Sequence, residues 1–154
     1  MYKIIISIVC ICQMCLCDGP DALKGLKEVQ VFILPNKLTD DIQFQIRNDV
    51  EIKLKMIGLK VNPNATEILC INVLTNEVGG EISSYYGSIE ILLRHPRIQV
   101  IRIETIQTDA IIWKSNVHLL HGPPEGFNKR CREGVKDLVD SFINDYLTTN
   151  GGMK

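Results

Sequence analysis

The stretch SSYYGSIEILLR, residues 83–94, has the clearest alternation of side chains in this chain. Successive side chains of a β-strand point to opposite faces, so the stretch predicts a strand with two different surfaces. One face would hold Tyr85, Gly87, Ile89, Ile91 and Leu93, and the other Tyr86, Ser88, Glu90 and Arg94. The apolar face needs cover from other elements, whereas the second face can meet solvent.

Further strands are predicted on both sides of this stretch. They are residues 28–34, 59–61, 67–75, 98–106 and 109–119, the last two forming one or two strands. In the strand 67–75, Leu69, Ile71 and Val73 share the core face, and Cys70 takes the opposite face. The pair His95-Pro96 is expected to interrupt the sheet, because proline has no N–H to donate to a neighbouring strand.

Two segments carry apolar residues at helical spacing. The first, residues 40–57, places Ile42, Ile46, Val50, Leu54 and Ile57 on one side. The second, residues 127–148, does so with Cys131, Val135, Leu138, Val139, Phe142, Ile143 and Tyr146. Gly58 and Gly151 stand where helix C-termini favour glycine. Both helices are amphipathic and need an apolar surface to pack on.

These elements predict an α+β fold in the order β-α-β-β-β-β-α. A mostly antiparallel sheet with both helices packed on one face would bury every apolar stripe. The chain of 154 residues is the size of one domain, which we place at residues 28–150. Residues 18–27 are expected to be a loosely held lead-in, and residues 151–154 a frayed tail.

The first residues are typical of a secretory signal peptide, which we place at residues 1–17. Lys3 supplies the positive charge, and residues 4–12 are continuously apolar. This run is too short to cross a membrane, which takes about 20 residues. Small side chains at Cys15 and Cys17 favour cleavage before Asp18.

Cys17 also permits a lipoprotein interpretation, in which it would become the lipidated first residue of the mature protein. Leu16 precedes it, where lipoprotein sites favour a small residue. An uncleaved anchor and a buried N-terminal strand remain alternatives. We expect no membrane span once the signal is removed.

The charge balance and the cysteines restrict the function further. The 17 basic and 18 acidic residues argue against a nucleic-acid-binding protein, which normally has a large basic excess. Outside residues 1–17 only Cys70 and Cys131 remain, so the chain is no disulfide-rich scaffold. We expect these two cysteines to be unpaired, because they are assigned to opposite sides of the sheet.

Few residues suggest chemistry. His118 and His121 lie three residues apart, and together with Asp109 they could form the site of a small hydrolase. A metal site would need three or four convergent ligands, and the sequence places only these two histidines near one another. We expect no catalytic, cofactor-binding or metal-binding residues. The sequence Asn64-Ala65-Thr66 is a glycosylation sequon in a turn. Three acidic residues of the last helix, Asp137, Asp140 and Asp145, are the candidates for an interaction surface.

The C-terminal run Asp137-Leu138-Val139-Asp140, followed by Phe142-Ile143-Asn144-Asp145-Tyr146-Leu147, resembles the ending of a family of small uncharacterised bacterial exported proteins. Weaker similarities reach back to residue 22. That family has no assigned activity, so the resemblance implies no functional residues. The predicted element order is similar to that of the lipopolysaccharide-assembly lipoprotein and of the TolB amino-terminal domain, which are non-catalytic envelope proteins, although fold alone does not fix function.

The sequence therefore favours an exported, non-enzymatic envelope protein that binds another envelope protein or supports an assembly, in the periplasm or secreted. It carries no cofactor in this interpretation, and its partner is unknown. The alternative is a small extracytoplasmic hydrolase. An exposed apolar patch would favour the first, and convergence of three polar groups the second.

Cleavage of residues 1–17 is the first testable prediction. Protein recovered from the extracytoplasmic fraction should begin near Asp18 when its N-terminus is sequenced. Recovery of the intact chain with Met1 from the cytosol would contradict the signal-peptide interpretation.

Overall fold

The computed structural model describes residues 19–34, 36–78, 84–101 and 104–151. The predictions for residues 1–17 and for residues 152–154 fall outside them. In chain order the elements are η1 (Gly19–Leu23), β1 (Glu28–Ile33), α1 (Asp40–Met56), β2 (Lys60–Val61), β3 (Ile68–Val78), β4 (Ser84–Ile101), β5 (Glu104–Lys114), β6 (His118–Gly122) and α2 (Phe127–Asn150).

Within the described residues, six strands form one sheet in the order β2-β1-β3-β4-β5, with β6 also beside β4. β1 runs parallel to both β2 and β3. β4 runs antiparallel to β3 on one side and to β5 and β6 on the other. The sheet is thus mixed, and β5 and β6 follow one another along the same edge of β4.

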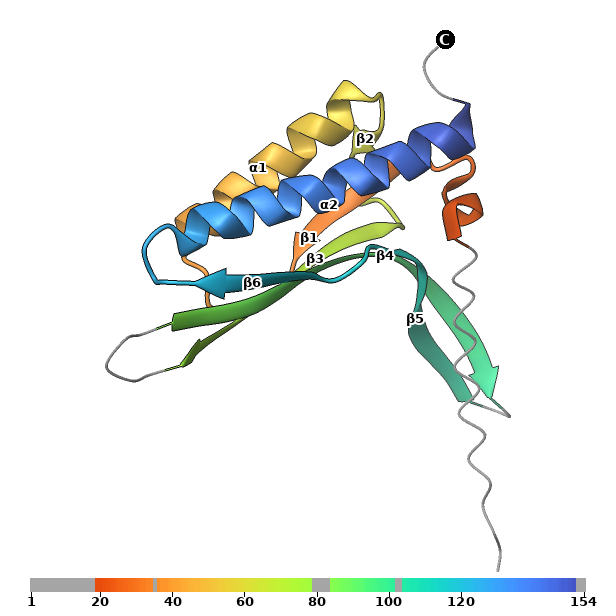
Figure 1. The fold of residues 1–154 in the computed structure, drawn as a ribbon. Helices are drawn as coiled ribbons and strands as arrows, with labels where there is room; N and C mark the ends of the chain where they lie inside the picture. Colours follow the sequence, from red (N-terminus) through yellow and green to blue (C-terminus); the bar gives the residue numbers. More distant parts are fainter. Residues whose placement is uncertain (1–18, 35, 79–83, 102–103, 152–154) are drawn as a thin grey trace, which may run out of the picture.

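Both helices lie on the same face of the sheet, as predicted (Figure 1). The core lies between them and the sheet. Leu69 and Ile71 of β3 and Ile89, Ile91 and Leu93 of β4 are completely buried there. The alternation in residues 83–94 therefore identified the correct face, and the α+β fold class is confirmed.

The expected interruption at His95-Pro96 is wrong, because β4 continues through both residues to Ile101. Pro96 is tolerated because β4 pairs with β3 only as far as Arg94 and beyond it only with β5. The register between β4 and β5 shifts between Leu93 and Arg94, which is a bulge. From this bulge the two strands bend away from the helices (Figure 1).

The lead-in differs from the loosely held segment expected. Leu23 is completely buried. The backbone N–H of Gly25 donates to Asn150 Oδ1 at 2.8 Å, and the Thr149 hydroxyl donates to the Pro20 carbonyl at 2.9 Å. The segment before β1 is therefore held against the C-terminal end of α2.

α2 lies close to the sheet at Gly134. A Cβ at this position would lie 2.8 Å from Ile89 Cδ1 and 3.0 Å from His118 Cδ2. Only glycine lets the helix backbone come this close to β4 and β6.

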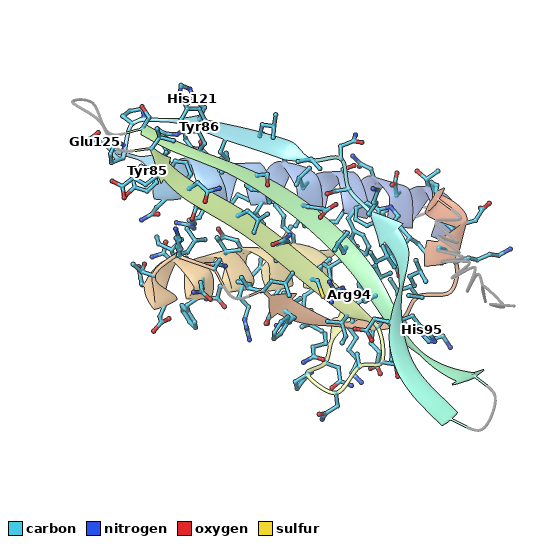
Figure 2. All side chains as sticks on the ribbon, turned by 90° about the horizontal axis from the view of Figure 1, so that it is seen from below. Tyr85, Tyr86, Arg94, His95, His121 and Glu125 are labelled. Carbon is cyan, nitrogen blue, oxygen red and sulfur yellow. The ribbon has the colours of Figure 1, made fainter. Side chains whose placement is uncertain are left out.

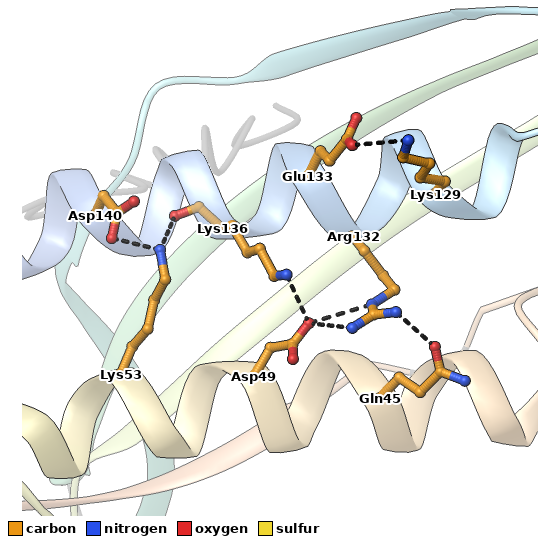
Figure 3. Close-up of polar contacts among 8 residues, drawn as sticks. All are labelled: Gln45, Asp49, Lys53, Lys129, Arg132, Glu133, Lys136 and Asp140. Carbon is orange, nitrogen blue, oxygen red and sulfur yellow. Dashed lines mark hydrogen bonds and ion pairs between the residues drawn. The ribbon is translucent and has the colours of Figure 1, made fainter.

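Charged side chains join the two helices on their outer side (Figure 3). Asp49 of α1 accepts from Arg132 Nη2 at 2.7 Å and faces Lys136 Nζ at 3.3 Å. Lys53 pairs with Asp140 one turn further along. Burial of Asp49 disfavours its charge, but the hydrogen bonds from Arg132 and Lys136 outweigh it and hold the pKa of Asp49 below its ordinary value.

We predict that Asp49→Asn lowers the free energy of unfolding by about 1 kcal/mol at pH 7. A lowered pKa in the folded state gives stability that is present above the unfolded-state pKa, about 4, and is lost as the pH falls through the folded-state pKa. The difference from the wild type should therefore disappear at more acidic pH in denaturant titrations. Asp137→Asn is the control, since Asp137 is exposed and forms no ion pair with a described residue. An Asp49→Asn deficit that persists undiminished in acid would contradict the ionic origin.

Phe142 is the largest completely buried side chain of α2, and its ring meets that of Trp113 edge-on at 5.0 Å. We predict that Phe142→Ala destabilises the fold by about 3–5 kcal/mol in denaturant titrations. Phe44→Ala is the matched control, because Phe44 is 63% exposed on α1 and should cost little. Equal effects of the two substitutions would show that the stripe of α2 is not the core face.

Candidate functional site

The face of the sheet opposite the helices is called here the open face (Figure 2). Its residues are those that alternate with the buried ones. The pairing register places Leu74, Ser88 and Leu119 in one row across β3, β4 and β6. Asn76, Tyr86 and His121 form the next row. The open face therefore mixes polar and large apolar side chains.

Four large apolar side chains are exposed near one end of this face. They are Leu74 (54% exposed), Val78 (54%), Tyr86 (46%) and Leu119 (78%), and we call them the open-face patch. Isolated exposed apolar residues are ordinary, but neighbouring ones on one surface are typical of a binding site.

His121 lies beside this patch. Its ring is 4.5 Å from that of Tyr86, with the two ring planes tilted by 42°. Both side chains point outward near the end of the sheet where Glu125 also lies (Figure 2). The ring of Tyr86 thus has a polar aromatic neighbour. Side chains that combine an apolar ring with a polar group are common on surfaces that are exposed to water until a partner binds.

The other end of the open face, near the bend, has buried residues at its centre. Cys70 and Leu92 lie on this face but are only 2% and 6% exposed. Arg94 approaches Asp109 to 3.9 Å at the bend, and His95 Nδ1 lies 3.2 Å from Glu67. These contacts occupy the charged groups at this end, and Phe32, in the same row as Cys70 and Leu92, is 39% exposed.

Both described cysteines are unpaired, as expected, and both are buried. Cys131 lies on the side of α2 that faces the sheet, whereas Cys70 lies on the open face, so the sheet separates them. Burial raises the pKa of the Cys70 thiol, and it raises the pKa of Cys131 to about 11. Neither thiol is activated as a nucleophile at neutral pH.

The residues of the hydrolase alternative do not converge. His118 packs beneath Gly134 on the helix side of β6, and His121 lies on the open face. Asp109 pairs with Pro96 beyond the bend and faces Arg94. Among the described residues, no group of three or more His, Cys, Asp or Glu side chains could hold a metal ion.

The three acidic residues of α2 have different surroundings. Asp137 is exposed, whereas Asp140 pairs with Lys53 (Figure 3). Asp145 accepts a hydrogen bond from Trp113 Nε1 at 2.9 Å. The Trp113 bond ties the helix to β5, so Asp145 has a structural contact that the sequence did not indicate. Asp137 and Asp140 are the two exposed members of the predicted surface.

A hollow of about 270 Å³ lies where both helices begin. Its polar lining comes from Lys37, Thr39, Thr75, Glu77, Tyr85 and Asn128. No nucleophile among these residues is hydrogen-bonded to a base within the described structure, so the hollow lacks an arrangement for covalent catalysis. The predicted glycosylation sequon Asn64-Ala65-Thr66 lies just before β3. Its Asn64 is exposed in a turn.

None of the helices in the described ranges is long and apolar enough to cross a membrane. No protein-family model matches the chain, and no curated protein has a matching sequence. The resemblance of the C-terminal run to a family is therefore not confirmed.

Solved structures share the general layout. A PelC dodecamer from Paraburkholderia phytofirmans is similar with a TM-score of 0.41 and 16% identity, over 75% of this chain and 86% of that one. A minor lipoprotein from Acinetobacter baumannii is similar with a TM-score of 0.39 and 13% identity, over 81% and 93%. Both similarities are too distant to support a functional argument.

Proposed function

We propose that this protein is an exported, non-catalytic module that binds another protein through the open-face patch. The observation that carries the proposal is the exposure of Leu74, Val78, Tyr86 and Leu119 on one face of the sheet, opposite the two helices. A sheet face that bears such side chains is stabilised when another layer covers them.

The composition of the open face favours a protein partner. Ser88 separates Leu74 from Leu119 in their shared row, and Asn76 and His121 flank Tyr86 in the next. Apolar and aromatic anchors surrounded by polar groups are typical of protein–protein interfaces, which are apolar at the centre and polar at the rim.

Two further observations support the non-catalytic part of the proposal. The candidate hydrolase residues His118, His121 and Asp109 point to different regions, and the buried thiols have raised pKa values. Export is supported by the charged and apolar pattern of residues 1–17. Asp137 and Asp140 remain a second candidate surface, on the opposite side of the molecule from the open-face patch.

Site-specific photocrosslinking tests the proposal. A photoreactive phenylalanine analogue in place of Tyr86 should give one discrete product of higher mass in cells that express the full chain. Leu74→Asp in the same chain should reduce that product by about tenfold, because a charge would replace an anchor of the patch. The purified variant should keep the wild-type unfolding midpoint, since Leu74 is exposed.

The same analogue at Phe44, which is 63% exposed on the outer side of α1, is the matched control and should give no such product. Equal products from Tyr86 and Phe44 would contradict a specific surface. A product with the mass of two copies of this chain as the sole crosslinked species would contradict a heterologous partner at this patch.

A further inference from the structure

The two edges of the sheet are protected to different degrees. β2, at one edge, has only two residues, and its Lys60 pairs with Glu28 at 3.2 Å. A short edge strand that carries lysine resists pairing with another chain.

β6 lies at the opposite edge and lacks these protections (Figure 2). Its five residues, His118–Gly122, include no lysine, arginine, acidic residue or proline. β4 is its one strand partner within the described residues. Leu119 is 78% exposed, and Val117 just before the strand is 55% exposed. The outer backbone groups of β6 are thus free to pair with a further strand.

We propose that β6 pairs antiparallel with β6 of a second copy of this chain, which would join two sheets edge to edge. This surface is the outer edge of β6, and it adjoins the open-face patch, with which it shares Leu119. In a two-fold antiparallel pair the contacts are reciprocal: if residue i of the first copy faces residue j of the second, then residue j of the first copy faces residue i of the second.

The charges beside β6 favour the second copy as the occupant. Lys114 ends β5 before β6, and Glu125 follows β6. Both are exposed, and neither forms an ion pair with a described residue. An antiparallel pair brings Lys114 of each copy towards Glu125 of the other copy, whereas a parallel pair would bring like charges together. The edge is therefore complementary to itself in the antiparallel direction.

The apolar side chains fit the same arrangement. A register centred on Leu119 places this residue opposite its own copy and Val117 opposite His121, all of them exposed in a single chain. The N–H of Ser115 donates to Ile91 of β4, and His118 pairs with Ile89 of β4. Three residue steps on this segment therefore match two steps on β4, so the segment contains one extra residue before β6. This irregularity just before β6 leaves only a short regular pairing around Leu119, so the dimer should be weak, in the micromolar range or weaker.

Sedimentation velocity over a range of concentrations tests the proposal on protein purified from cells that express the full chain. The wild type should form a reversible dimer. Leu119→Lys should abolish it, because a lysine on an edge strand opposes pairing. Leu74→Lys is the matched control, since Leu74 lies on the same face but on the central strand β3, and it should leave the dimer intact.

A charge exchange tests the direction of pairing. Lys114→Glu should weaken the dimer by about three- to tenfold at low ionic strength, and the double variant Lys114→Glu with Glu125→Lys should restore it. A wild type that stays monomeric at the highest concentration would overturn the proposal. So would a dimer that survives Leu119→Lys or that Leu74→Lys abolishes. These outcomes are independent of the photocrosslinking at Tyr86, so the two proposals can fail separately.

Discussion

The close packing of α2 on the central strands determines the rest of this structure. Phe142 fills the space against Trp113, and Gly134 lets the helix backbone reach Ile89 and His118. Because α2 and α1 both occupy this face, none of the helices and strands in the described residues covers the opposite face over β3, β6 and the first half of β4. The exposed apolar residues of the open face are therefore a direct result of where the helices lie.

Much of this fold could be predicted from the sequence, because its signals are local. The strict alternation in residues 83–94 identified the core face of β4, and the helical stripes identified both helices to within a few residues. The prediction that His95-Pro96 interrupts the sheet was wrong, because its outcome depends on strand pairing and not on the local sequence. Whether a proline disrupts a sheet depends on how many neighbours its strand has at that point, and β4 has lost β3 there.

The candidate site was less accessible from the sequence. Tyr86 was assigned to the opposite face from the sequence, but no sequence pattern indicated how far each residue of that face is exposed. Leu92 and Cys70 lie on the same face and are buried, and no sequence pattern separates them from Leu74. Likewise, Asp145 looked like its neighbours on α2, and only the pairing of β5 with β4 brings Trp113 to it.

The absence of a side chain at Gly134 also affects the contact between the helix layer and the sheet. A Cβ there would lie 2.8 Å from Ile89 Cδ1, which is closer than real Cβ contacts come, so it would clash with the sheet layer. The Ile89 and His118 side chains or the helix backbone would have to shift to make room for it. One missing methyl group thus lets the backbone of α2 lie directly on side chains of β4 and β6, without a gap between the two layers at this point.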